Sequence, residues 1–175
     1  MLHQSLSTFC LQTDAALRLL RVEYLMGPES DLRRSEAAAL LALAREHATR
    51  HLLIDMRTVP LLSVDDELWL SDHFMPGLVA LDLAQLVLIV GSHQTYHQLT
   101  IDALHDLIQP QMRFDAQYFD DPATALHWLT DDSPRVPALL AEWAARRPAP
   151  PAAGAATLAA TTGVAAAESA LDLAG

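Results

Sequence analysis

The sequence predicts an α/β fold with a mixed sheet of about five strands, a leading β-hairpin and a cover of about four helices. Two continuous apolar runs, within residues 51–57 and 86–91, stop at turn residues, as strands buried on both faces do. Amphipathic segments alternate with these runs, which is typical of parallel strands joined by helices. Two short segments near the beginning of the chain predict the hairpin.

The hairpin is expected to consist of strands at 9–13 and 17–25, joined by a turn at 13–16. In the second strand, apolar side chains alternate with the charged side chains of Arg21 and Glu23. This alternation predicts an antiparallel strand with one face in the core and the other face in water.

The first helix is expected to begin at Ser30 or Asp31, either of which can cap it, and to run to about Arg50. Its apolar residues recur with helical spacing at Ala37, Leu40, Leu41, Ala44 and Ala48. The apolar run at 51–55 then predicts a strand.

The second helix is expected to begin after Ser63, which is an N-cap residue, and to continue to Met75. Three acidic residues at 65–67 favour the positive end of the helix dipole. The dipeptide Pro76-Gly77 is expected to end this helix, because both residues disfavour helical continuation.

The remaining core elements follow the same alternation. A strand is expected at 86–90, a helix after Ser92, and a last strand at 114–119. Asp121 is expected to cap the final core helix, with Pro122 at its first position. The predicted order is therefore β-β-α-β-α-β-α-β-α.

Composition divides the chain into three parts. Residues 1–132 are expected to form one α/β domain, and 133–147 a short C-terminal helix. Residues 148–175 are rich in alanine and proline and contain few large apolar side chains. Such a segment cannot offset its ordering entropy, so a disordered tail is predicted.

Charge and composition exclude several classes of function. The 175-residue chain has a formal net charge of −11, which disfavours nucleic acid and anionic membrane surfaces as partners. It contains no lysine, so mechanisms that need a catalytic or Schiff-base lysine are excluded. The longest apolar stretch, 78–90, is interrupted by Asp82 and Gln85, and no stable membrane insertion is expected. The first residues lack the features of a signal peptide, so a cytoplasmic location is predicted.

Polar side chains follow the predicted parallel strands at their carboxyl ends, where ligands usually bind in such sheets. Asp55 and Arg57 follow one strand, Gly91, Ser92 and His93 follow the next, and Asp120 and Asp121 follow the last. Among them, Asp55, Arg57, Ser92 and His93 are the candidates for ligand or partner contact; the alternative is that all of these are ordinary turn and cap residues. An enzyme would need Asp55, Arg57 and His93 to converge on one cleft. No catalytic motif supports that chemistry, so no catalytic residue, metal or cofactor is predicted.

Several of these segments together resemble a known family. They are the strand end Leu52-Leu53-Ile54-Asp55-Met56-Arg57, the helix that Ser63 opens, and the closing segment 119–129, Phe-Asp-Asp-Pro-Ala-Thr-Ala-Leu-His-Trp-Leu. With the leading hairpin, they resemble the SpoIIAA-like branch of the STAS-like superfamily, which is also compared with SEC14 (CRAL-TRIO) domains. The resemblance covers about residues 8–129. It implies a non-enzymatic, cytoplasmic module with a regulatory role that acts through contact with a protein partner. The motifs do not specify the identity of that partner.

In the anti-sigma-factor antagonists of that superfamily, a serine at the start of the helix after the third strand is phosphorylated, and Ser63 is the equivalent by order. The usual Asp-Ser-Ser-Gly is replaced here by Leu-Ser-Val-Asp at 62–65, and the following acids would repel a phosphate. The alternative is that Ser63 is only a helix cap. The predicted contact surface is the helix from Ser63 to Met75, with Trp69 as its anchor if that side chain is exposed.

A second function remains open at this point. The chain is alternatively a carrier of a small apolar or lipid ligand, with its pocket between the sheet and the helices that follow Ser63 and Ser92. This hypothesis requires a continuous apolar cavity lined by Trp69, Phe74 and Leu78.

Overall fold

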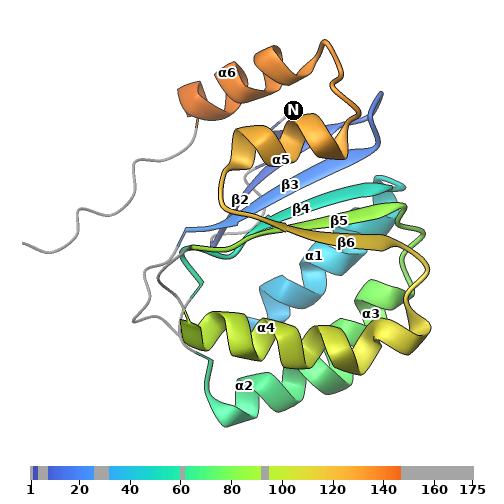
Figure 1. The fold of residues 1–175 in the computed structure, drawn as a ribbon, viewed down its shortest axis with the longest axis vertical. Helices are drawn as coiled ribbons and strands as arrows, with labels where there is room; N and C mark the ends of the chain where they lie inside the picture. The colour runs from blue at the N-terminus through green and yellow to red at the C-terminus, as the bar shows by residue number, and fades with distance from the viewer. Residues whose placement is uncertain (1, 4–7, 26–31, 60–61, 92–94, 147–175) are drawn as a thin grey trace, which may run out of the picture.

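A computed structural model describes residues 2–3, 8–25, 32–59, 62–91 and 95–146 of the chain. These residues form an α/β fold around one mixed sheet of six strands (Figure 1). The sheet order follows the chain, with β1–β2 and β2–β3 antiparallel and β3 to β6 parallel. The strands are β1 (Leu2–His3), β2 (Phe9–Asp14), β3 (Leu19–Tyr24), β4 (His51–Asp55), β5 (Gln85–Ile89) and β6 (Asp115–Phe119).

The helices cover both faces of the sheet. They are α1 (Arg34–Glu46), α2 (Val64–Trp69), the π-helix η1 (Leu70–Phe74), α3 (Met75–Val79), α4 (Thr95–Ile108), the 3₁₀-helix η2 (Gln109–Gln111), α5 (Pro122–Leu129) and α6 (Val136–Arg146). Parallel strands in chain order with right-handed crossovers place successive connecting helices on the same face. Accordingly α1 to α4 lie on one face, and α5 and α6 lie on the other (Figure 1).

The predicted fold class is confirmed. The hairpin is β2–β3, the other expected strands are β4, β5 and β6, and the short β1 adds one edge strand. Asp121 caps α5 as expected, because its carboxylate accepts the backbone N–H of Thr124 at 2.7 Å, and Pro122 begins the helix.

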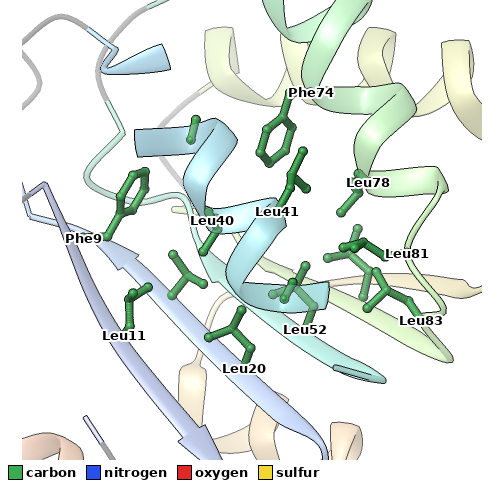
Figure 2. Close-up of a cluster of buried hydrophobic side chains, with 14 of the residues drawn as sticks. Phe9, Leu11, Leu20, Leu40, Leu41, Leu52, Phe74, Leu78, Leu81 and Leu83 are labelled. Carbon is green, nitrogen blue, oxygen red and sulfur yellow. The ribbon is translucent and has the colours of Figure 1, made fainter. Parts of the chain in front are cut away.

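Side chains from the parallel strands alternate between two apolar clusters. Even-numbered side chains of β3 to β6 face α1–α4, and Figure 2 shows Leu20 and Leu52 of this set opposite Leu41 of α1 and Phe74 and Leu78 of the η1–α3 segment. Odd-numbered side chains face α5 and α6 and form a smaller cluster. Both faces are therefore buried, as the continuous apolar runs of β4 and β5 predicted.

Three details of the predicted elements are wrong. The first is the extent of α1, which ends at Glu46 and not near Arg50. Ala48, expected on its apolar face, has a φ of 46° and turns the chain towards β4. The predicted caps of this helix, Ser30 and Asp31, lie outside the described residues.

The second correction concerns Pro76 and Gly77, which do not end the helix that follows Ser63. The π-turn of η1 precedes them and α3 continues to Val79. A π-turn interrupts the normal hydrogen-bond ladder, so the proline is accommodated at the start of the next helical segment. Gly77 permits close packing on α1, because a Cβ atom there would lie 2.6 Å from Cδ1 of Leu41.

The third correction concerns the hairpin face that was expected to be in water. Arg21 and Glu23 are only 4% and 2% exposed, because α6 folds back over this face. The guanidinium carbon of Arg21 lies 3.9 Å from the ring centroid of Trp143 in α6, a cation–π contact. Burial of the Arg21 charge therefore depends on a helix more than 100 residues away in the chain.

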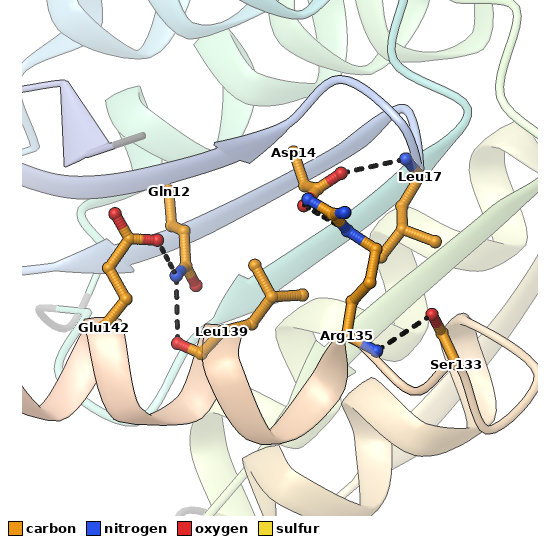
Figure 3. A network of polar contacts seen from close by, with 7 residues as sticks. All are labelled: Gln12, Asp14, Leu17, Ser133, Arg135, Leu139 and Glu142. Atoms are coloured by element: carbon orange, nitrogen blue, oxygen red, sulfur yellow. Dashed lines mark hydrogen bonds and ion pairs between the residues drawn. The ribbon is translucent and has the colours of Figure 1, made fainter.

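Polar contacts also hold α6 on the hairpin (Figure 3). The side-chain amide of Gln12 donates to the carbonyl of Leu139 at 2.9 Å and to the carboxylate of Glu142 at 3.0 Å. Arg135 donates from Nε and Nη2 to one oxygen of Asp14, at 2.9 and 2.7 Å. Within the described part of the chain, no helix is both long enough and apolar enough to cross a membrane.

Candidate functional site

Asp55 and Arg57 form a paired charge at the carboxyl end of β4. The Asp55 side chain is 2% exposed, and its two oxygens accept hydrogen bonds from Arg57 Nε at 2.9 Å and Nη2 at 2.7 Å. The backbone N–H of Arg57 also donates to Asp55, at 3.1 Å. Such a bidentate pair occupies both carboxylate oxygens and fixes the loop that follows the strand.

Further carboxylates surround this pair. Glu23 lies next to Asp55 in the sheet register, and the charges of Glu23 and Asp121 both act on Arg57. The hydrogen bonds to Asp55, aided by these charges, raise the pKa of Arg57 against the opposing effect of burial. Asp121 is committed to the α5 cap, and its bonds to Thr124 hold its pKa below the ordinary value. The charged groups at this end of β4 therefore already have partners within the protein.

Two of the predicted contact residues, Ser92 and His93, lie outside the described residues. The structure therefore describes only the Asp55–Arg57 part of the predicted edge. The described residues therefore do not test whether Asp55, Arg57 and His93 converge on one cleft, as the enzyme hypothesis requires.

Ser63 is an N-cap, as the sequence indicated. Its Oγ accepts the backbone N–H of Asp66 at 3.1 Å and donates to the Asp66 carboxylate at 2.8 Å. Asp66 is also paired with Arg34 of α1, whose Nε donates at 2.8 Å. Burial acts to raise the pKa of Asp66, but the bonds from Ser63 and Arg34 outweigh it and keep that pKa low. Phosphorylation of Ser63 stays a prediction.

Trp69 is half-buried and packs against the larger apolar cluster. Its ring stacks on His73, with centroids 5.9 Å apart and planes 6° apart. The exposed apolar side chains of α2 are instead Val64 and Leu68, which are 72% and 57% exposed. An anchor on this helix would therefore be formed by those two residues rather than by Trp69.

An apolar pocket lies between the sheet and the α1–α4 layer, and its volume is about 130 Å³. The sheet contributes Phe9, Tyr24, Ile54, Asp55, Leu86, Leu88, Ala116 and Tyr118. The helices contribute Ala37, Leu40, Leu70, Phe74, Met75, Leu78, Leu104, His105 and Ile108. Of the three residues that the carrier hypothesis named, Phe74 and Leu78 line this pocket, and Trp69 is not among its lining residues.

The centre of the sheet is unusually accessible at this pocket. Ile54 and Leu88 occupy inner positions of β4 and β5, two strands with neighbours on both sides, yet both side chains are only half-buried. The residues that alternate with them, Leu53 and Val87, are fully buried on the opposite face. The helical layer therefore leaves space above the middle of the sheet.

Almost all of the lining surface is apolar, although Tyr24, Asp55, His105 and Tyr118 are among the lining residues. Tyr118 on β6 and His105 on α4 both line the pocket, with ring centroids 6.1 Å apart in an edge-on arrangement of 79°. Neither residue was among those predicted from the sequence to form a site. Strand alternation could have indicated Tyr118 as a lining residue. It pairs with Leu88 in the sheet register and therefore lies on the same inner face.

A second, more polar cleft lies at the opposite, amino-terminal ends of the strands. Its histidines already have partners: Nδ1 of His51 lies 3.0 Å from Oε1 of Gln85, and Nδ1 of His127 lies 2.9 Å from Oδ1 of Asp132. The apolar pocket is thus the better candidate for a binding site, because it combines enclosure with a continuous apolar lining.

Comparisons with known proteins were made at three levels. Protein-family models, curated proteins and solved structures contain no match to this chain.

Proposed function

We propose that this chain is a non-enzymatic module that binds a small apolar ligand between its sheet and its α1–α4 helices. The observation that carries the proposal is the apolar pocket of about 130 Å³. A protein cavity of about 150 Å³ with a similar lining holds benzene, so the expected ligand has roughly one ring or a short aliphatic chain. This proposal favours the carrier hypothesis over the protein-contact hypothesis.

The chemistry of the lining supports binding rather than catalysis. Transfer of apolar surface from water into such a pocket is favourable by about 25 cal/mol per Å². The carboxylate of Asp55 would be the natural acid or base at the strand end. Both of its oxygens already accept hydrogen bonds from the side chain of Arg57. A ligand in the pocket therefore meets mainly apolar side chains.

Toluene is a suitable first probe, and thermal unfolding is the readout. A ligand that binds only the folded state stabilises it by RT ln(1 + [L]/Kd), which is about 1 kcal/mol at five times Kd. For a domain of this size, we expect the melting temperature to rise by ~2–4 °C.

The matched variants are Ala116→Leu and Gln117→Leu. Ala116 lines the pocket, so the larger side chain should fill it and abolish the rise in melting temperature. Gln117 is the exposed neighbour on β6 and points to the opposite face, so its variant should keep the rise. The proposal is wrong if the wild type does not respond, or if Ala116→Leu responds as strongly as the wild type.

A second proposal concerns a protein partner, and the exposure of Val64 and Leu68 on α2 favours it. These residues are four apart and therefore share one helical face. The resemblance to SpoIIAA-like domains supports a regulatory contact at this helix. We expect Leu68→Glu to lose a partner that co-purifies with the wild type, whereas Leu107→Glu, at an exposed leucine on α4, should retain it. Equal retention by both variants would count against this contact surface.

A further inference from the structure

The strand β6 lies at one edge of the sheet and is open to solvent. Among the described strands it is the last in the sheet order, and it pairs with β5 (Figure 1). Every residue of β6 is exposed or half-buried, whereas every residue of β2 and β3 is buried. The side of β6 that faces away from β5 is therefore accessible.

The hydrogen bonds between β6 and β5 show which backbone groups face this open edge. The N–H of Asp115 and the carbonyl of Phe119 bond to the residues that flank β5, at 3.1 and 2.9 Å. In a parallel ladder, one residue directs its N–H and C=O to the neighbouring strand, and the next residue directs both away from it. The N–H and C=O groups of Ala116 and Tyr118 therefore point to the open edge.

An edge of this kind can accept a further strand. Alternate N–H and C=O groups that point in one direction have the spacing that an extended peptide needs for pairing. The side chains of such a peptide would alternate between the α4 side and the α5 side of the sheet. On the α5 side, the exposed ring of Trp128 lies 5.7 Å from the ring of Phe119 and offers an aromatic contact.

The charges around the edge favour basic side chains in the added strand. Residues 102–120 contain four aspartates, at 102, 106, 115 and 120, and one arginine, Arg113, and all five are exposed. Burial raises the pKa of the tyrosine in β6, and the charges of Asp102 and Asp106 on α4 raise it further, which places both acids near the strand. The edge therefore lies in a negative field.

We propose that the open edge of β6 binds an extended peptide of a partner protein, which carries basic side chains and pairs with Ala116 and Tyr118 as an additional strand. A second copy of this chain fits less well, because it would bring the same acids together and has the same net charge of −11. This contact goes beyond the apolar-ligand function and does not require it.

A short peptide of alternating arginine and valine is the probe, and amide exchange measured for each residue by NMR is the first readout. In the free protein, the amides of Ala116 and Tyr118 should exchange faster than that of Gln117, which bonds to β5. Saturating peptide should slow the exchange of Ala116 and Tyr118 about tenfold or more. Slow exchange of both amides in the free protein would mean that this chain already covers the edge and would overturn the proposal. Peptide binding without slower exchange at the two amides would also overturn it.

The variant Ala116→Pro tests the backbone pairing by titration calorimetry. Proline removes the N–H that points to the edge, and this N–H makes no bond to β5, so the sheet loses no hydrogen bond. We expect the variant to bind the arginine–valine peptide about fivefold more weakly or worse. The matched control Ala116→Gly keeps the N–H and should stay within about twofold of the wild type. Equal affinities of the two variants would overturn the proposal, and if Ala116→Pro does not fold, amide exchange in the wild type decides.

The charge selection is tested with a second peptide, in which glutamate replaces arginine, and with two protein variants. The glutamate peptide should not bind detectably, and equal binding of the two peptides would overturn the proposal. Asp115→Asn should weaken the arginine peptide about two- to fivefold at low salt. Asp72→Asn makes the same change of charge at an exposed position on η1, outside β6 and α4, and should leave the affinity unchanged. Equal losses in the two variants would contradict a contact at this edge.

Discussion

The two faces of the sheet are covered by helices in different ways. The face under α1–α4 is almost entirely apolar and retains a pocket over the half-buried Ile54 and Leu88. The face under α5 and α6 combines a small apolar cluster with buried polar groups, among them Gln12, Asp14 and Arg21. Helices that cover a sheet with apolar side chains can therefore still leave a cavity above it. Charged side chains on a strand can also be buried when a helix packs over them.

A cavity beside the first face should make that face more tolerant of lost side-chain volume. Leu126 of α5 is fully buried in the smaller cluster, and its replacement by alanine should lower the free energy of unfolding by about 2–5 kcal/mol. Leu88 already borders the pocket and is half-buried, so Leu88→Ala should cost less. Urea unfolding of both variants measures the difference. A larger loss for Leu88→Ala would contradict the comparison.

Added volume should have the reverse effect on the two faces. Ala125 of α5 is fully buried in close-packed surroundings, so Ala125→Leu should destabilise the protein by about 1–3 kcal/mol. Ala116 lines the pocket, and Ala116→Leu should be close to neutral or stabilising. Equal destabilisation by the two variants in urea would mean that the pocket has no room for a larger side chain.

The ion pair under α6 tests how the second face is held. Asp14 is buried, which acts to raise its pKa, but hydrogen bonds from Arg135 and from the backbone of Leu17 outweigh burial and lower that pKa. Arg135→Leu leaves the carboxylate without its cation and should lower stability at pH 7 by about 1–3 kcal/mol. Because the Arg135 side chain is 55% exposed, the lower part of this range is expected.

The pH dependence has a definite sign. A carboxyl group whose pKa is lowered by folding contributes stability above its unfolded pKa, which is about 3.8 for Asp14, and that contribution is lost as the pH falls through the folded pKa. The difference between the wild type and Arg135→Leu should therefore shrink below about pH 3.8. Urea unfolding at several pH values measures it, and a difference that stays constant down to pH 3 would exclude this ion pair as the cause.

The sequence contained enough information to predict the central architecture. Local signals specify it: the apolar runs at 51–55 and 86–90 are strands buried on both faces, and Asp121-Pro122 is a strong helix start. The contact that buries Arg21 was not predictable in this way. It requires Trp143 to fold back onto the hairpin, and periodicity within β3 carries no record of that distant helix.

The candidate site was only partly predictable for a related reason. The pattern of the chain predicted an interface between sheet and helices, and Phe74 and Leu78 do line the pocket there. Whether side chains fill such an interface depends on helix spacing, which hydrophobic patterning does not specify. Tyr118 and His105 also line the pocket, and hydrophobic patterning could not single them out for the same reason.

The smallest predicted effects concern the two helix caps, one on each face. Ser63 caps α2 with an exposed neutral hydroxyl, and Ser63→Ala should lower stability by about 0.5–1 kcal/mol. Asp121 caps α5 with a carboxylate that accepts two bonds from Thr124, both at 2.7 Å, so Asp121→Ala should cost about 1–2 kcal/mol. Urea unfolding of the two variants measures this difference.

The variant Ser63→Asp separates the helix-capping role of Ser63 from its hydrogen bond to the Asp66 carboxylate. An aspartate can still accept the N–H of Asp66, so the cap is preserved, but it cannot donate to the Asp66 carboxylate as the hydroxyl does. The two adjacent negative charges should then compete for Arg34. We expect Ser63→Asp to be less stable than the wild type at low salt and to approach it as salt screens the repulsion. A salt-independent loss would show that charge at this position does not disturb the contact between α2 and α1.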